Sequence, residues 1–286
     1  MALETGGRPA VVEEDMASTR LGAGLGRNEI SAQAVERTAA AVTAYVARAR
    51  QRGADEVKIV GTAALRRDDL RRAFERALGP LPAAAFEVLS PEKEGALVLL
   101  AGRRSLPLST GLLTAVDVGG GSAQIARETG PAGGAAVRSY PIGCVAVTER
   151  FLGETAGDAD AWDRAALFIR GQLADVRPAA GDVIVTGGTA TAAVAVELGM
   201  GEYDADEIRG RTVSAVGIAS LGRRVYDMPV AERRRLAGMP PARADIFPAG
   251  ALAVAAVLEA LGVAEAVVSV QGVRFGVAYE CFGDIG

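Results

Sequence analysis

The sequence LLTAVDVGGGSAQIAR (residues 112–127) joins two apolar segments through three consecutive glycines. It predicts strands at 112–118 and 123–127 with a glycine hairpin turn between them. Glycines let backbone N–H groups approach an anion closely, and Asp117 at the strand end is placed to bind Mg²⁺ beside a phosphate. The alternative interpretation is an ordinary glycine-rich hairpin in which Asp117 caps the turn.

A second apolar strand, VIVT (residues 183–186), also runs into a glycine turn, which Gly187, Gly188 and Thr189 form. A helix is expected to follow, and the partial positive charge at a helix N-terminus attracts anions. The alternative is an ordinary strand-to-helix turn in which Thr189 caps the helix. Two such turns in one chain, each at the end of a strand, favour a phosphate-binding cleft between them.

Two segments nearer the N-terminus carry side chains suited to phosphate chemistry. GTAALRR (residues 61–67) follows a predicted strand, and its Thr62 and Arg66 are candidates to contact an anion. In SPEKEGA (residues 90–96) a Ser-Pro pair opens a helix, and Glu94, one turn further on, is a candidate to deprotonate a water molecule. The alternative for residues 61–67 is an ordinary solvated helix start. The alternative for residues 90–96 is that the carboxylates only stabilise the helix dipole.

Strands and helices alternate along most of the chain, which predicts an α/β fold. Two domains are expected, 1–111 and 112–286, with their boundary in the proline-containing loop 102–111. The most apolar stretch, 249–270, is interrupted by two glutamates, so a buried core helix followed by a strand at 267–270 is expected instead of a membrane span. The rest of the C-terminal part is expected to be helical.

The composition of the 286 residues excludes several classes of chemistry. Histidine is absent, which rules out Ser-His-Asp triads, His-ligated zinc and histidine bases. The net charge of -4 argues against a broadly basic nucleic-acid binder, although 29 of the 31 cationic residues are arginines, which suit phosphate recognition. Cys144 and Cys281 match no metal or disulfide spacing, and residues 1–24 do not resemble a signal peptide. We therefore expect a cytoplasmic protein.

Taken in order, these motifs resemble the exopolyphosphatase / guanosine pentaphosphate phosphohydrolase (Ppx/GppA) family. The resemblance runs from TRLG near the N-terminus to the end of the chain. No single motif is decisive, but the ordered set is highly specific. The segments that carry it are TRLG (19–22), GTAALR (61–66), SPEKE (90–94), DVGGGS (117–122), TGGT (186–189), YD (203–204), PARAD (241–245) and GAL (250–252).

This resemblance implies two actin-like (ribonuclease-H-like) ATPase-type domains around a cleft, with the last helix packing back on the first domain. It implies Mg²⁺-assisted attack of water on the terminal phosphate of inorganic polyphosphate or of guanosine penta/tetraphosphate. Glu94 corresponds to the glutamate that activates the water, and Asp117 and Gln124 to the metal site. The phosphate-binding positions are Thr62, Arg66, Gly119, Gly120, Gly121, Ser122, Gly187, Gly188 and Thr189. No nucleic-acid or membrane partner is implied, and a homodimer is kept as an expectation because family members often dimerise.

The chain also departs from the family pattern. The family begins with a strand that ends in an Asp-x-Gly-Ser loop, and no such segment precedes the strand expected at the N-terminus here. We interpret this as a start codon placed too late; the alternative is a truncation that has lost catalysis. Gln124 replaces a family glutamate and so lacks a negative charge, whereas Gly95 replaces an alanine, which we expect to be a mild change.

Two other functions remain open on these observations. One is a catalytically impaired protein that binds polyphosphate or (p)ppGpp and regulates without turnover, which the missing loop and Gln124 favour. The other is a sugar or acetate kinase of the same actin-like superfamily, which the short chain and the Ser-Pro-Glu-Lys-Glu segment disfavour.

Overall fold

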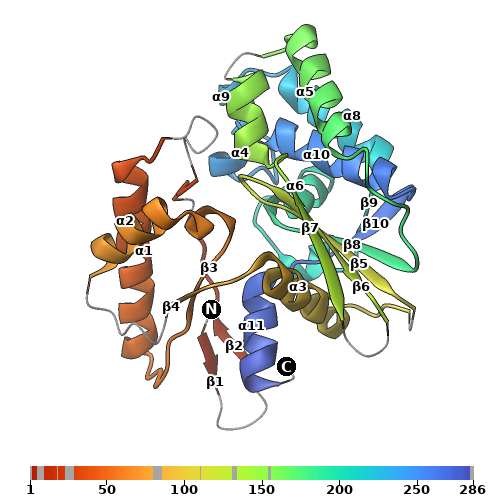
Figure 1. Ribbon diagram of the computed structural model, residues 1–286. Coiled ribbons are helices and arrows are strands. Elements are labelled where there is room, and N and C mark those ends of the chain that lie inside the picture. Colours follow the sequence, from red (N-terminus) through yellow and green to blue (C-terminus); the bar gives the residue numbers. More distant parts are fainter. Residues whose placement is uncertain are drawn as a thin grey trace. The chain divides into compact units, whose positions relative to one another are not determined.

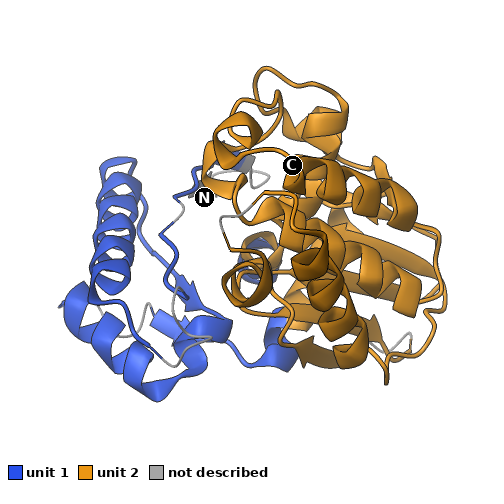
Figure 2. Cartoon of the chain, turned by 90° about the horizontal axis from the view of Figure 1, so that it is seen from above, with its two compact units in different colours: residues 1–94, 277–286 blue, residues 95–276 orange. Residues whose placement is uncertain are grey.

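The computed structural model describes residues 2–4, 10–17, 19–22, 29–79, 86–109, 111–130, 134–153 and 156–283. It divides into two compact units, which Figure 2 colours separately. Unit 1 comprises Met1–Glu94 and Val277–Gly286, and unit 2 comprises Gly95–Gly276. The division falls within helix α3 (Pro91–Ser105), between Glu94 and Gly95, and helix α3 also takes in the first residues of the expected boundary loop 102–111.

In unit 1 the described strands form two separate sheets, in which β1 pairs with β2 antiparallel and β3 pairs with β4 parallel. Helix α2 connects β3 to β4, as a parallel pair requires. The elements are β1 (Ala2–Glu4), β2 (Ala10–Glu13), α1 (Ala32–Gln51), β3 (Ile59–Gly61), a 3-10 helix (Ala63–Arg66), α2 (Asp68–Leu78) and β4 (Phe86–Val88).

Unit 1 has a small core between its helices and the β3–β4 pair. The Ser31 side chain caps α1 by accepting a hydrogen bond from the Ala34 amide at 3.2 Å, which satisfies one of the free donors at a helix start. The rings of Phe74 and Phe86 lie 5.6 Å apart between centroids. The buried members of this core are Val35, Ala39, Leu65, Leu70 and Phe74.

Unit 2 is built on a six-stranded sheet with the order β7-β6-β5-β8-β10-β9 (Figure 1). Strands β5, β8 and β10 run parallel, and β6, β7 and β9 pair antiparallel with their neighbours. The strands are β5 (Leu113–Val118), β6 (Ala123–Glu128), β7 (Ala135–Tyr140), β8 (Asp182–Thr186), β9 (Thr212–Ser214) and β10 (Glu265–Val268).

Helices cover both faces of this sheet. The helical elements are α3, α4 (Cys144–Val147), a π-helical turn (Thr148–Leu152), α5 (Ala159–Gln172), α6 (Gly188–Glu197), α7 (Ala205–Ile208), α8 (Ala215–Tyr226), α9 (Val230–Arg233), a 3-10 helix (Pro241–Arg243), α10 (Phe247–Ala260) and α11 (Val273–Phe282). The expectation that the C-terminal part is helical apart from one strand was wrong, because β9 adds a short edge strand.

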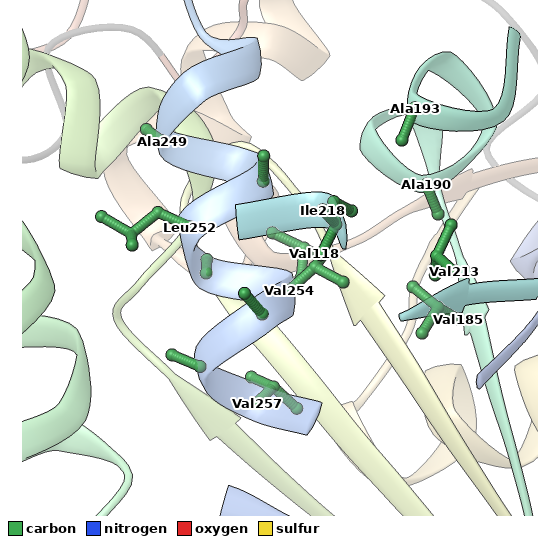
Figure 3. Packing of buried hydrophobic residues seen from close by; sticks show 14 of the residues in the cluster. Val118, Val185, Ala190, Ala193, Val213, Ile218, Ala249, Leu252, Val254 and Val257 are labelled. Atoms are coloured by element: carbon green, nitrogen blue, oxygen red, sulfur yellow. The ribbon is translucent and has the colours of Figure 1, made fainter. Parts of the chain in front are cut away.

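Helix α10 forms the centre of the larger core, as Figure 3 shows. Its residues from Phe247 to Leu258 are all buried, and Gly222 of α8 lies so close that an added Cβ would be 2.7 Å from Ala251. The prediction of a buried core helix is confirmed, and the strand after it begins at Glu265, two residues earlier than expected. Within the described residues no helix is both long and apolar enough to span a membrane.

The other face of the sheet is covered by α3, which approaches it through glycines. A Cβ on Gly95 would lie 2.9 Å from the Cβ of Ala126 and would also collide with Val137, and one on Gly102 would collide with Ile184. Helix α11 crosses α3 backbone to backbone, since a Cβ on Gly276 would overlap Leu97. The expectation that glycine in place of the family's alanine is a mild change was therefore wrong for this chain. Gly95 lies at a contact between helix and sheet that leaves no room for a side chain.

Candidate active site

Parallel pairing of β5 with β8 brings the two predicted phosphate turns together. Asp117 lies opposite Thr186, so the residues that follow each strand meet at the carboxyl edge of the sheet. Gly187 has a φ of 92°, a conformation that favours glycine, and a Cβ there would lie 2.8 Å from the Asp117 Oδ1 atom. The Asp117 carboxylate thus lies directly against the second glycine turn.

The first glycine turn is held from one side by helix α4. The Gly119 carbonyl accepts a hydrogen bond from the Cys144 amide at 2.9 Å, and the Gly120 carbonyl accepts one from the Val145 amide at 2.9 Å. Gly120 and Gly121 are exposed, and no acceptor for their amide groups lies in the described part of the chain. Their N–H groups are therefore available as hydrogen-bond donors, and an anion site at this turn stays a prediction.

The second turn opens helix α6, but Thr189 does not cap it. The N-cap is Gly187, and the Thr189 side chain is 3% exposed and packs against Gly250. Thr189 can therefore contribute its amide, one of the donors that a helix start leaves unsatisfied, while its hydroxyl is buried. The alternative interpretation with Thr189 as the cap is wrong.

The guanidinium of Arg243, a residue of the PARAD segment to which the sequence analysis gave no role, lies over the second turn. A Cβ placed on Gly188 would fall on the Arg243 guanidinium, which therefore sits at the N-terminus of α6. The helix end carries partial positive charge, so both groups favour an anion at this point. The signal in the sequence is the PARAD segment, where two prolines, Pro240 and Pro241, fix the 3-10 turn that presents Arg243.

Gln124 lies opposite Asp117 in the β5–β6 register and is 6% exposed. Residues directly opposite in an antiparallel pair project from the same face, about 5 Å apart at Cβ. No group of three acidic, histidine or cysteine ligands occurs among the described residues. Mg²⁺ is commonly held by only one or two carboxylates together with substrate phosphates and waters, and Asp117 with the Gln124 amide oxygen fits that kind of site.

Cys144 lies behind these turns as a structural thiol. Burial raises its pKa to about 11, against the smaller lowering effect of the Arg243 charge. A thiol that stays protonated is a poor nucleophile. Cys144 is therefore not suited to act as a nucleophile in this site.

The remaining predicted residues come together within unit 1. An ion pair joins the Arg66 guanidinium to the Glu94 carboxylate, and the Arg66 Nε also donates to the Leu89 carbonyl at 2.9 Å. Glu94 is 6% exposed on the first turn of α3, where the Ser90 hydroxyl accepts from the Lys93 amide at 3.1 Å. Arg66 thus fixes the position of the candidate base, a role that its spacing in the sequence did not indicate.

Thr62 is half-buried at the start of the 3-10 helix that contains Arg66. Its side chain makes no capping hydrogen bond, while its carbonyl accepts from the Leu65 amide at 2.9 Å. In unit 2, Ser122 closes the glycine hairpin, its carbonyl accepting from the Gly119 amide at 2.9 Å. The predicted site residues therefore form two sets, one in each unit.

Comparison with known proteins identifies the family of the chain. Residues 2–284 match the Ppx/GppA phosphatase family. The chain is 29% identical over 290 residues to Exopolyphosphatase 2 of Mycobacterium tuberculosis, covering 95% of this chain and 89% of that protein.

Solved structures give the same result. The Ppx/GppA family member of Aquifex aeolicus is 26% identical, with a TM-score of 0.78 over 96% of this chain and 89% of its own. An exopolyphosphatase from Cytophaga hutchinsonii, at 18% identity, shares the fold with a TM-score of 0.84 over 99% of this chain and 94% of its own. The expected actin-like α/β fold is confirmed, and the chain belongs to the Ppx/GppA phosphatase family.

Proposed function

We propose that this protein is an exopolyphosphatase-type phosphohydrolase that releases the terminal phosphate of inorganic polyphosphate, of pppGpp, or of both. The observation that carries the proposal is the contact of Asp117 with Gly187, which joins two glycine turns at one sheet edge beneath Arg243. Exposed amides and a guanidinium suit the closely spaced negative oxygens of an oligophosphate end. The name of the mycobacterial relative supports polyphosphate as the substrate.

In this proposal Glu94 is the general base. Its carboxylate takes a proton from a water molecule as the water oxygen bonds to the terminal phosphorus, and the bond from that phosphorus to the bridging oxygen breaks. The products are orthophosphate and a chain that is one phosphate shorter. Arg66 is a positioning residue, because its ion pair fixes the carboxylate and its second hydrogen bond anchors it to the Leu89 carbonyl.

Mg²⁺ remains part of the proposal, with Asp117 and Gln124 as the residues that would hold it. A bound Mg²⁺ neutralises negative charge on the phosphate oxygens during transfer. The amides of Gly120 and Gly121 and the Arg243 guanidinium hold the same phosphate group through hydrogen bonds. Positioning and charge neutralisation suffice for this chemistry, so the absence of histidine is no obstacle.

The test is phosphate release from long-chain polyphosphate and from pppGpp in Mg²⁺, comparing wild type with Glu94→Gln. The matched control is Glu92→Gln, which removes an exposed carboxylate from the same helical turn. We expect Glu94→Gln to lower kcat by roughly 10²- to 10⁴-fold on the true substrate and Glu92→Gln to leave it unchanged. Equal rates for wild type and Glu94→Gln on both substrates would falsify the assigned role.

A second candidate function rests on Gln124. The register places this neutral, buried side chain beside Asp117, so the metal site has one carboxylate fewer than a glutamate at that position would supply. The candidate is a protein that binds polyphosphate or (p)ppGpp without turnover. Calorimetry that detects binding while phosphate release is absent, together with activity gained in Gln124→Glu, would favour it over the hydrolase.

The same proposal places the protein in a reducing cytoplasm. Its support is that Cys144 is buried and Cys281 exposed, both as free thiols.

A further inference from the structure

A cavity of about 390 Å³ lies in unit 2 between strands β6 and β7 and the segment that follows helix α5. It is on the opposite face of the sheet from Asp117, because Ile125 and Arg127 alternate with Gln124 and Ala126 along β6. The residues that line the cavity are Ile125, Arg127, Ala136, Arg138, Tyr140, Asp175, Val176 and Arg177. We call this cavity the arginine groove.

The groove has an excess of positive charge on a protein whose net charge is -4. Its walls carry three guanidiniums and one carboxylate, and that carboxylate, Asp175, is already paired with Arg138. Arg177 is exposed. Two positive charges of the groove are therefore not matched by an acidic side chain of its own lining.

Arg127 is the most informative of these charges because it is partly buried. It donates to the backbone carbonyl of Pro178 at 2.8 Å and to that of Arg177, and no carboxylate is among its contacts in the described part of the chain. Burial lowers the pKa of its guanidinium, which is the effect of desolvating a charge without an opposing one. An anion in the groove would supply the missing partner.

The lining combines buried side chains with exposed charges, and a ligand would meet the exposed charges. Ile125 and Tyr140 are the buried members of the lining, and Arg138 lies opposite Ile125 in the β6–β7 register. Arg127 lies two residues further along β6, about 7 Å away at ~3.3 Å per residue. This spacing suits an extended ligand with several charged groups better than a single small anion.

We propose that the arginine groove binds an internal stretch of an inorganic polyphosphate chain. The proposal rests on the proposed function in one respect, that polyphosphate is a ligand of this protein. Polyphosphate repeats one charged group along a flexible chain, so one molecule long enough can occupy the groove while its end is held elsewhere. The groove then raises the effective concentration of the chain end without taking part in the reaction.

The test removes the two exposed arginines, in the variant Arg138→Gln/Arg177→Gln. Arg127 is left in place because its hydrogen bonds hold the backbone at 177–178. The control, Arg224→Gln/Arg234→Gln, loses the same two charges at exposed positions outside the groove. Asp175→Asn removes the one carboxylate of the lining and is expected to strengthen the binding of polyphosphate.

Binding is measured by fluorescence anisotropy of end-labelled long-chain polyphosphate, with EDTA present so that no turnover occurs. We expect the groove variant to weaken binding by roughly two- to fivefold per arginine at low salt, and less at high salt. The control should bind like wild type and Asp175→Asn more tightly. In Mg²⁺, the groove variant should raise KM for long chains while kcat and the rate on tripolyphosphate stay unchanged.

The outcomes separate this proposal from the proposed function. If wild type releases no phosphate from any substrate, the hydrolase proposal fails, and the anisotropy comparison still decides the groove. Equal affinity of the groove variant and its control for long-chain polyphosphate would overturn the groove assignment. So would a groove variant that loses affinity for single-stranded RNA and keeps its affinity for polyphosphate, because the ligand would then be a nucleic acid.

Discussion

At the scale of single residues, the ion pair of the partly buried Arg66 with the buried Glu94 links stability to the proposed chemistry. Arg66→Gln leaves the Glu94 carboxylate buried without its guanidinium, and we expect the free energy of unfolding to fall by about 1–3 kcal/mol. Because the two side chains act together, Arg66→Gln/Glu94→Gln should lose less stability than the sum of the single changes. Urea unfolding of the three variants measures this coupling, and strictly additive losses would show that the pair contributes no energy.

The two cysteines should differ sharply in reactivity. Cys281 is exposed, whereas burial raises the pKa of Cys144 to about 11, from an ordinary 9.0. A thiol reagent at pH 8 should therefore modify one cysteine in the native protein and both in denaturant. The raised pKa also makes stability depend on pH. The unfolded chain loses the Cys144 proton at a lower pH than the folded protein does, so the free energy of unfolding falls as the pH rises from about 9 to about 11. Two fast-reacting thiols in the native state would contradict this burial.

At the scale of elements, the contact of α3 with the sheet depends on Gly95. Gly95→Ala inserts a methyl group against Ala126 and Val137, and we expect it to cost about 1–3 kcal/mol in the free energy of unfolding. The matched control is Gly171→Ala near the end of α5, where nothing lies within 4 Å of the added Cβ. That change should stabilise the protein by roughly 0.5–1 kcal/mol. If chemical denaturation shows that both variants change the free energy of unfolding in the same direction, the tight contact at Gly95 is refuted.

The start of α6 offers a second test, because Gly188 leaves the space that Arg243 occupies. Gly188→Ala should displace the guanidinium from the glycine turn and weaken substrate binding, seen as a several-fold rise in KM for polyphosphate. Gly121→Ala is the comparison on the other turn, where an added Cβ meets nothing within 4 Å. A KM that moves equally in both variants would point to the loss of glycine itself, not to Arg243.

At the scale of the whole molecule, the two units differ in how much core they contain. In the described part of unit 1 the core cluster has five buried residues and the strands form two two-stranded sheets, an arrangement that is marginal by itself. Unit 2 has a six-stranded sheet and helix α10, which is buried from Phe247 to Leu258. Native-state hydrogen exchange should therefore give lower opening free energies for α1 and α2 than for β5, β8 and α10. Uniform protection of all these elements would argue for a single cooperative unit.

Much of this architecture could be predicted from local sequence patterns. The strands on either side of the glycines at 119–121, the glycine start of α6 and the buried helix α10 all follow from periodicity and turn chemistry, which act over a few residues. Strand β9 was missed because its three residues carry too short a pattern, and the loop expected at 102–111, which contains Pro107, takes in the last turn of α3. Gly95 and Gly102 lie within this helix. Those glycines serve contacts with distant strands, which a local pattern does not record.

The sequence by itself determined the family, the α/β class and the residue types of the site, because ordered motifs and strand-end glycines are written in the chain. Only the tertiary structure decided which of these groups touch. The parallel pairing of β5 with β8 sets Asp117 against Gly187, the fold brings Arg243 over Gly188, and Arg66 meets Glu94. Each of these contacts joins residues from 28 to 70 positions apart, and burial and strand pairing, not spacing, select them.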